Sequence, residues 1–87
     1  MSQNVPENLE EQLRQLIASV IVRSPDELKT ETNFFKDLGV DSIKAIEITV
    51  SLERNFKISI RDEQIPQIET FGQAVELVRK ALEKKNS

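Results

Sequence analysis

The sequence predicts an all-α fold: a four-helix bundle with three longer helices, one short helix and a long loop between helices one and two. Three stretches carry apolar residues at helical spacing, and each begins close to a helix start signal. The stretch that alternates like a strand, residues 58–60, is too short and has no partner strand. With 87 residues, the chain is expected to form a single domain, 1–87, with an ordered core of about 6–84.

The first helix is expected over about 6–22. Its apolar residues form one broad stripe at helical spacing, which core packing explains: Leu9, Leu13, Leu16, Ile17, Val20 and Ile21. Pro6 suits the first turn of a helix because its missing N–H is not needed there. Glu7, Glu10 and Glu11 lie in the first turns, where the helix dipole favours negative charge.

A capping box with proline at the first helical position, residues 24–27, predicts one further helical turn, anchored by Leu28. A long loop follows from residue 29 to residue 41. Long ordered loops in small domains tend to be functional. We expect the loop to be pinned to the helices by its apolar residues, with at least one of Phe34 and Phe35 buried.

The loop ends in a turn that opens the second helix. Gly39 can take a positive φ angle at little cost, and Asp41 is a good N-cap for the helix that follows. Ser42 is then the first helical residue, with its hydroxyl at the positive end of the helix dipole, where a phosphate ester would be stabilised. The chain has no histidine to act as a base, so Ser42 is interpreted as an attachment point and not as a nucleophile.

The second helix, about 42–55, has two apolar sides. The core side comprises Ala45, Ile48, Thr49, Leu52 and Phe56. Ile43, Ile46 and Val50 form a second stripe about 140° away, and a small bundle cannot bury both sides of one helix. The second stripe therefore either faces a partner or lines a gap that admits an apolar guest. We expect Ile43 and Val50 to be exposed, whereas Ile46 is either exposed or packed under the loop.

The remaining residues complete the core. Ile58 and Ile60 are expected to point inward from an extended connector, followed by one helical turn over 62–65 whose length Pro66 limits. A second capping box at 70–73 opens the last helix, which ends at about Lys84. Its core face has helical spacing and comprises Phe71, Ala74, Val75, Val78 and Leu82.

Composition excludes several classes of protein. The chain has no cysteine and no histidine, which argues against a disulfide framework, a zinc site or thiol catalysis, so we expect no catalytic residue and no metal site. Its 12 Lys and Arg against 15 Asp and Glu give a net charge of -3, which argues against a nucleic-acid partner. Without a long apolar run or a signal-peptide start, no membrane partner is expected, and the predicted location is cytoplasmic.

The turn and its flanks resemble the acyl carrier protein family, whose phosphopantetheine attachment motif reads Gly-x-Asp-Ser-Leu. The matching residues here are Gly39, Val40, Asp41, Ser42 and Ile43. The flanking stretches 34–38 and 56–60 also match at the family's spacing, and residues 7–83 cover its whole length. The resemblance implies a monomeric bundle of acyl carrier type that is not an enzyme. It also implies a 4'-phosphopantetheine arm attached covalently to Ser42 by a phosphopantetheinyl transferase, with Asp41 capping the helix and assisting loading.

The resemblance further implies that acyl groups are held as thioesters on the arm and that the second helix meets acyl-transferring and chain-extending enzymes. The implied partner-binding residues are Ile43, Ile46, Glu47, Val50 and Glu53. This helix is typically strongly acidic in the family, whereas Lys44, Arg54 and Lys57 depart from that pattern. The departure favours a specialised pathway over the ordinary fatty acid synthase. Ile65 and Ile68 are expected to close over the core or over the end of an acyl chain.

Within the family, fatty acid, polyketide, aminoacyl and other specialised carriers share the motif. Residues 34–38 and the Asp-Ser-Ile form of the motif favour an acyl carrier over a peptidyl carrier. Met1 and the polar tail predict a free-standing carrier, and the alternative is a piece of a larger synthase. The alternative function is an unmodified helical protein–protein interaction module that binds an amphipathic partner through the second helix. A small helical DNA binder is disfavoured by the acidity.

Overall fold

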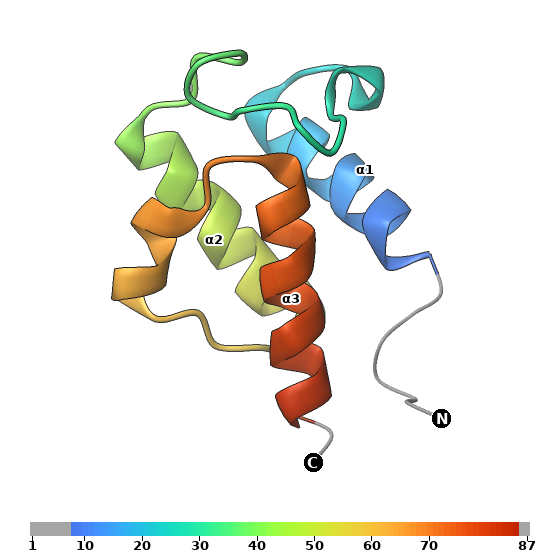
Figure 1. Ribbon diagram of the computed structural model, residues 1–87, viewed down its shortest axis with the longest axis vertical. Helices are drawn as coiled ribbons and strands as arrows, with labels where there is room; N and C mark the ends of the chain where they lie inside the picture. Colours follow the sequence, from blue (N-terminus) through green and yellow to red (C-terminus); the bar gives the residue numbers. More distant parts are fainter. Residues whose placement is uncertain (1–7, 86–87) are drawn as a thin grey trace.

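The computed structural model describes residues 8–85 of the chain and the side chains of residues 8–84. Its elements are α1 (Leu9–Ile21), η1 (Pro25–Glu27), α2 (Ser42–Phe56), η2 (Asp62–Gln67) and α3 (Phe71–Lys85). This confirms the predicted all-α architecture: three long helices, the short helix η2, the additional turn η1 and a long loop between α1 and α2 (Figure 1). The first helix begins at Leu9, after the N-cap Asn8, so the predicted start at about residue 6 is too early; Pro6 itself lies outside the described residues.

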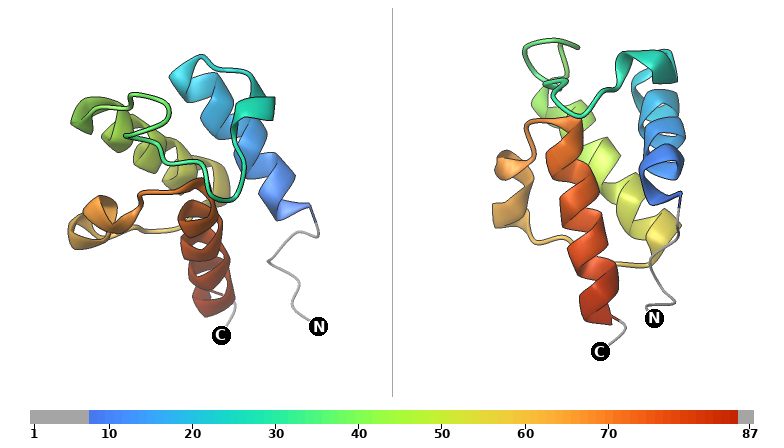
Figure 2. Two further views of the ribbon diagram at one scale, coloured as in Figure 1. Left: turned by 45° about the horizontal axis from the view of Figure 1, so that its top comes forward. Right: turned by 45° about the vertical axis from the view of Figure 1, so that its right-hand side comes forward.

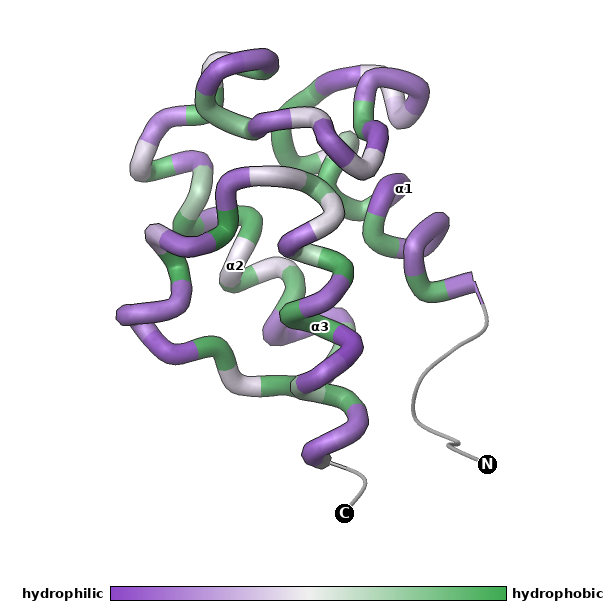
Figure 3. The backbone as a smooth tube through the Cα atoms, viewed as in Figure 1, coloured by the Kyte–Doolittle hydropathy of each residue, from purple (hydrophilic) through white to green (hydrophobic). Residues whose placement is uncertain are grey.

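The core lies where the three long helices meet. α1 packs against both α2 and α3. Hydrophobic and hydrophilic residues alternate along each of these helices (Figure 3). The predicted core face of α3 is buried throughout, and so is that of α2 except for the half-buried Ala45. In α1, Leu9, Leu13 and Ile17 are buried, whereas Leu16, Val20 and Ile21 are half-buried. The largest fully buried side chains are Phe71, Leu13, Ile17, Leu28, Leu52 and Val78. Burial of these apolar faces, and not helix propensity, supplies most of the helical stability.

α1 and α2 end in the same unusual way. Val22 follows α1 with φ 57° and ψ 54°, and Lys57 follows α2 with φ 56° and ψ 49°, so both lie in the left-handed region. In each case the backbone N–H closes the helix, donating to Ala18 O after α1 and to Glu53 O after α2. The first helix therefore stops one residue before the predicted end, because Val22 has left the helical conformation.

The loop of residues 29–41 crosses the end of the bundle above the start of α3 (Figure 1). Three backbone hydrogen bonds fasten it there: Phe34 N–H to Glu69 O (2.8 Å), Phe71 N–H to Thr32 O (3.0 Å) and Gly72 N–H to Thr30 O (2.9 Å). Phe34 is the buried phenylalanine at 2% exposure, whereas Phe35 is 38% exposed. The prediction that at least one of the two is buried is thus confirmed.

Both predicted capping boxes are present. Glu27 accepts a hydrogen bond from Ser24 N–H at 3.2 Å before η1. Before α3, the hydroxyl of Thr70 accepts from Gln73 N–H at 3.2 Å, and Gln73 Oε1 accepts from Thr70 N–H at 2.9 Å. Each box satisfies backbone N–H groups that have no partner within their own helix.

The predicted end of the short helix at residue 65 is wrong, because η2 runs on to Gln67. Two successive turns build it, closed by Gln64 N–H to Arg61 O (2.9 Å) and by Ile68 N–H to Ile65 O (3.1 Å). Pro66 lies inside the second turn; it has no N–H to donate, and its fixed φ is compatible with the turn. Ile58 and Ile60 of the preceding connector are buried, as predicted.

Candidate functional site at the start of α2

Asp41 is the N-cap of α2, as the sequence predicts. Its backbone is extended, at φ -96° and ψ -178°, and its side-chain Oδ1 accepts from Lys44 N–H at 2.8 Å. Its own carbonyl oxygen accepts from Ala45 N–H at 2.9 Å, the first hydrogen bond of the helix. The cap fixes where α2 begins, and therefore which side chain stands at the positive end of its dipole.

Ser42 is the first residue of α2, and it is exposed. Within residues 8–85, the backbone N–H groups of Ser42 and Ile43 have no hydrogen-bond partner. Two free N–H groups and the helix dipole favour negative charge beside the Ser42 hydroxyl. The residues present therefore fit a phosphate ester at this position, and the exposed hydroxyl leaves room for a long substituent.

The loop that leads to Ser42 is held by its own polar groups. Asn33 Oδ1 accepts from Phe35 N–H (2.9 Å) and from Lys36 N–H (2.8 Å). Val40 N–H donates back to Phe34 O at 2.9 Å. Gly39 turns the chain at φ 66°, where an L side chain is disfavoured, and thereby directs it into the cap of α2.

Arg23 adds a contact from outside the loop that sequence reasoning missed. Its guanidinium donates to Leu38 O at 3.1 Å and to Glu27 Oε1 at 2.8 Å, which ties the end of α1 to the turn before Ser42. The two partners of Arg23 lie 4 and 15 residues away. Only the pair with Glu27 lies at a spacing from which a contact can be predicted from the sequence alone.

The second apolar stripe of α2 is exposed. Ile43 is 70% exposed, Ile46 51% and Val50 37%, whereas Ile48 on the opposite side of the helix is 4% exposed. The alternative in which Ile46 packs under the loop is therefore wrong. Three large apolar side chains in solvent on one helix face, beside an exposed serine, form the kind of surface that another protein covers.

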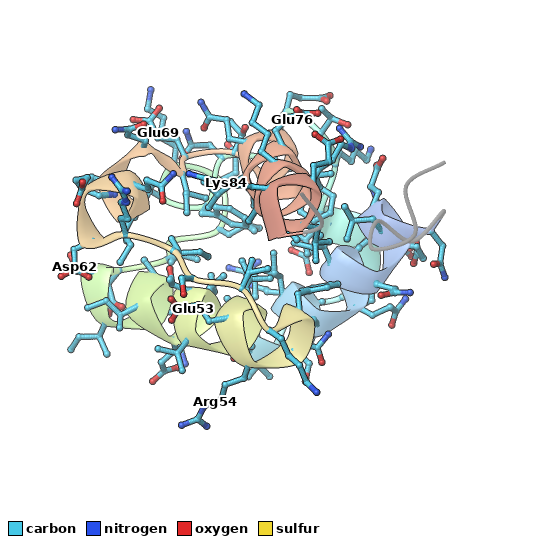
Figure 4. The ribbon with its side chains drawn as sticks, turned by 90° about the horizontal axis from the view of Figure 1, so that it is seen from below. Glu53, Arg54, Asp62, Glu69, Glu76 and Lys84 are labelled. Carbon is cyan, nitrogen blue, oxygen red and sulfur yellow. The ribbon has the colours of Figure 1, made fainter. Side chains whose placement is uncertain are left out.

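The charged residues of α2 separate into two groups. Lys44 Nζ pairs with Glu47 Oε1 at 3.0 Å beside the apolar stripe, with side chains that are 38% and 52% exposed. Glu53 instead turns toward the connector after α2, where Oε2 accepts from Ile60 N–H at 2.8 Å, while Arg54 points away from the bundle (Figure 4). Glu53 thus has a role within the fold, and its predicted role in partner binding stays a prediction.

A small apolar crevice opens one helical turn along α2 from Ser42. Its walls come from the loop, α2 and η2, and include Phe34, Val40, Ala45, Ile48, Ile65 and Ile68. Its volume is about 10 Å³, which is room for about one water molecule. The crevice is therefore nearly closed in this conformation. It lies on the core side of α2 and is not lined by Ile43, Ile46 or Val50, so it is not the gap that the sequence predicts beside the second stripe.

Within residues 8–85, no group of three or more His, Cys, Asp or Glu side chains is arranged to hold a metal ion. None of the helices in that part of the chain combines the length and the apolar character needed to cross a membrane.

Comparison with known proteins gives concordant results. A family model described as "Phosphopantetheine attachment site" matches residues 11–78. An acyl carrier protein of Sulfurovum sp. (strain NBC37-1) is 35% identical over 66 residues, which cover 76% of this chain and 88% of that protein.

A solved structure, the apo doublet acyl carrier protein from prodigiosin biosynthesis, is 31% identical, with a TM-score of 0.74. The match covers 85% of this chain and 36% of that one, so this chain spans about a third of that protein. The exposed serine at a capped helix start, the helical bundle and these matches agree with one another. The chain belongs to the acyl carrier protein family, as a phosphopantetheine-bearing carrier and not an enzyme.

Proposed function

We propose that Ser42 is the residue to which 4'-phosphopantetheine is attached, and that the arm holds acyl intermediates as thioesters. The single observation that carries this proposal is the exposed Ser42 hydroxyl at the first position of α2, directly after the Asp41 cap. A phosphopantetheinyl transferase would move the arm from coenzyme A to this oxygen and form a phosphodiester. The chain contains no cysteine, so the thiol that carries the cargo comes with the arm.

Asp41 has a structural part in this proposal. Its carboxylate accepts from Lys44 N–H and leaves the N–H groups of Ser42 and Ile43 free for the phosphate oxygens. Because a capped helix start does not fray, the hydroxyl is presented to the transferase in one position. By family analogy, Asp41 also assists the transferase during loading.

The partner surface that we propose consists of Ile43, Ile46, Val50 and Glu47. Exposure of the three apolar residues supports this assignment. The transferase, acyl-transferring enzymes and chain-extending enzymes would all approach Ser42 across this face. The ion pair between Lys44 and Glu47 leaves the face without a dominant charge, so we expect apolar contacts to contribute more to docking than attraction to a basic patch.

We further propose that the carrier serves a specialised acyl pathway, such as polyketide assembly, in preference to the ordinary fatty acid synthase. The mixed charge of α2 supports this, since Lys44 and Arg54 stand among its exposed or half-exposed residues. The similar carrier from prodigiosin biosynthesis is a specialised carrier of the same fold. The monomeric state and cytoplasmic location expected from the sequence stay predictions.

The crevice beside α2 would shelter an acyl chain only after it opens. Ile65 and Ile68, both half-buried on and after η2, form the wall that would move. Each methylene group that enters is stabilised by about 0.8 kcal/mol, so longer chains favour the open form more strongly. Short cargo is expected to stay in solvent on the arm.

Intact mass tests the proposed attachment. The protein is incubated with coenzyme A and a broad-specificity phosphopantetheinyl transferase, alongside Ser42→Ala and the control Ser59→Ala, which removes another exposed hydroxyl. We expect the wild type and Ser59→Ala to gain one phosphopantetheine and Ser42→Ala to gain none. A gain in Ser42→Ala refutes the attachment residue, and no gain in a folded wild type favours the unmodified interaction module.

A further inference from the structure

We infer that a basic groove between α3, η2 and the connector after α2 binds an acidic, amphipathic peptide segment of a partner protein. The chemistry of this ligand follows from the groove itself. Assignment of the segment to an enzyme that handles the acyl cargo rests on the proposed function. The groove lies away from Ser42, so such a partner would hold the carrier without covering the attachment residue.

Four cationic side chains gather on this groove, whose volume is about 790 Å³. They are Lys57 and Arg61, at the two ends of the connector, and Lys80 and Lys84 on α3. All four are exposed, and Lys84 lies on the side of α3 that faces η2 (Figures 2 and 4). Glu63 is the only acidic residue among the described residues of the lining. These five residues therefore contribute a formal charge of +3 to a chain whose net charge is -3.

Most of this positive charge has no role within the fold. The side chains of Lys80 and Lys84 have no ion-pair or hydrogen-bond partner among the described residues. Arg61 lies 3.8 Å from Glu63, with side chains 73% and 71% exposed, so this pair contributes little to stability. Helix dipoles favour cations at the last turn of a helix, which accounts for Lys57 and Lys84. They do not account for Lys80, five residues before the end of α3, or for Arg61 at the N-cap of η2.

Apolar surface lies between the cations and defines the rest of the ligand. Ile58 is buried beneath the groove, and Leu77 and Ala81 line it as half-buried residues of α3. A peptide with carboxylates on one side and apolar side chains on the other matches this surface, because it meets the cations and covers Leu77 and Ala81 together. A membrane fits less well, since the exposed large apolar side chains of the described residues all lie outside the groove.

A second copy of this chain is a poorer occupant than another protein. The acidic residues at the start of α1, Glu10 and Glu11, already pair with Arg14. The apolar residues beside them, Leu9 and Leu13, are buried in the core. That helix therefore offers neither unpaired carboxylates nor apolar side chains to the groove of a neighbour.

The groove and Ser42 lie at opposite ends of α2. Ser42 is the first residue of the helix, and Lys57 directly follows its last residue. Its 15 residues, at about 1.5 Å each, span roughly 22 Å. The loop before Ser42 and the connector after α2 lie toward opposite ends of the molecule (Figure 1). A partner held at the groove therefore leaves Ser42 accessible and raises the effective concentration of the arm at its own catalytic site.

Binding of a designed peptide tests the inference. The probe is a labelled peptide of alternating glutamate and leucine pairs, and its control has lysine in place of glutamate. We expect the wild-type protein to bind the glutamate peptide with a Kd below about 100 µM in about 10 mM salt and at least about tenfold more weakly in about 1 M salt. We expect no binding of the lysine peptide. NMR signals should shift at Ile58, Leu77 and Ala81 and stay unchanged at Ile43 and Val50.

Paired lysine variants give the matched comparison. We expect Lys80→Gln combined with Lys84→Gln to raise the Kd about tenfold, because two unpaired cations are removed from the groove. Arginine at both positions keeps the charge and should keep the affinity within about twofold. Lys29→Gln combined with Lys36→Gln is the control, since it changes the net charge equally at two exposed lysines of the loop. That variant should bind like the wild type.

Three results would overturn the inference: no binding at about 1 mM peptide, equal weakening in the two glutamine variants, or NMR shifts confined to the start of α2. Binding of phosphatidylglycerol vesicles without binding of the peptide would assign the groove to a membrane instead. Self-association that the glutamine variant at Lys80 and Lys84 abolishes would assign it to a second copy. A wild type that binds the peptide in the groove but takes no phosphopantetheine supports the peptide site and overturns the attachment at Ser42.

Discussion

Asp41 and Ser42 are adjacent in the sequence but have different roles, and the hydrogen bonds of Asp41 explain the difference. The carboxylate of Asp41 is occupied by Lys44 N–H at 2.8 Å, whereas the hydroxyl of Ser42 is exposed and is available for attachment. A change at Asp41 can therefore act through helix stability, through loading, or through both. Variants that preserve one property and remove the other distinguish these effects.

Two substitutions at Asp41 give such a separation. We expect Asp41→Ala to lower the free energy of unfolding by about 0.5–2 kcal/mol, because the cap is lost, and Asp41→Asn to keep nearly all of the stability. If the charge assists loading, as the family implies, Asp41→Asn loads more slowly although it is stable. Urea unfolding and the loading rate are the measurements, and equal loading by Asp41→Asn and the wild type would contradict a role for the charge.

At this scale, the sequence predicted what depends on local signals. Asp41 is a strong capping residue next to an apolar helix, so both the cap and the position of Ser42 followed from the pattern. The left-handed conformations of Val22 and Lys57 did not, because neither residue type favours that region. The bond between Glu53 and Ile60 N–H depends on the path of a connector that local propensity does not define.

Among the elements, the loop of residues 29–41 depends on the start of α3 for its shape. Gly72 is central to this contact, since its N–H donates to Thr30 O at 2.9 Å. A Cβ at position 72 would lie 2.8 Å from Thr30 Cγ2 and 2.9 Å from the same carbonyl oxygen. The methyl group can rotate away, but the hydrogen-bonded carbonyl cannot.

We therefore expect Gly72→Ala to destabilise the chain by about 1–3 kcal/mol, even though alanine is the better helix former. Amide hydrogen exchange should quicken at Phe34, Phe71 and Gly72, the donors of the three hydrogen bonds that fasten the loop. Gly39→Asn is the control, because nothing lies within 4 Å of a Cβ there and asparagine tolerates positive φ. Wild-type stability in Gly72→Ala would show that the loop is not held at this point.

The two sides of α2 give a second prediction at the element scale. Ile46 is 51% exposed and Ile48 is 4% exposed, two residues apart on one helix. We expect Ile46→Ser to change the free energy of unfolding by less than about 1 kcal/mol but to raise KM for loading, and Ile48→Ser to destabilise by roughly 2–5 kcal/mol. Thermal unfolding and loading kinetics measure both, and a strongly destabilised Ile46→Ser would mean that the stripe belongs to the core.

The elements were the most predictable level of the structure. The two faces of α2 and the core face of α3 followed from periodicity of 3.6 residues, and both capping boxes followed from residue types at fixed spacing. The extent of η2 differs from the prediction because Pro66, which is expected to limit the turn, lies inside it. Pro66 has no N–H to donate and its fixed φ is compatible with that turn, which the turn residues alone do not reveal.

Across the whole molecule, Arg14 joins parts that are distant in the sequence. Its Nε donates to Leu28 O at 2.7 Å, and its guanidinium lies 5.0 Å from the centre of the Phe71 ring. It also pairs with Glu10 and Glu11 within α1. One side chain on α1 thus contacts the end of η1 and the start of α3, near the place where the loop is fastened.

We expect Arg14→Gln to lower the free energy of unfolding by about 1–2 kcal/mol, because Leu28 O loses its donor and the ring loses its cation. Arg61→Gln is the matched control, since Arg61 is 73% exposed and lies 3.8 Å from an equally exposed Glu63. That variant should stay within about 0.5 kcal/mol of the wild type. Chemical denaturation of both measures the difference, and equal effects would rule out the proposed role of Arg14.

The whole-molecule arrangement was predicted through family resemblance more than through residue patterns. Helical periodicity gives the apolar faces, but it does not say which helices meet or how the loop crosses the bundle. The contacts of Arg14 with Leu28 and Phe71 span 14 and 57 residues, so no local pattern contains them. The arrangement of the helices was predicted because the motif around Ser42 is typical of one family, and the members of that family share one fold.

The central claim is that one hydroxyl, on the first residue of α2, bears the phosphopantetheine arm. Its most direct test is fragmentation mass spectrometry of the wild-type protein after loading, which locates the added mass on a single residue. We predict that the mass of one phosphopantetheine lies on Ser42 and on no other serine. The added mass on Ser24, Ser51 or Ser59 instead would contradict the assignment.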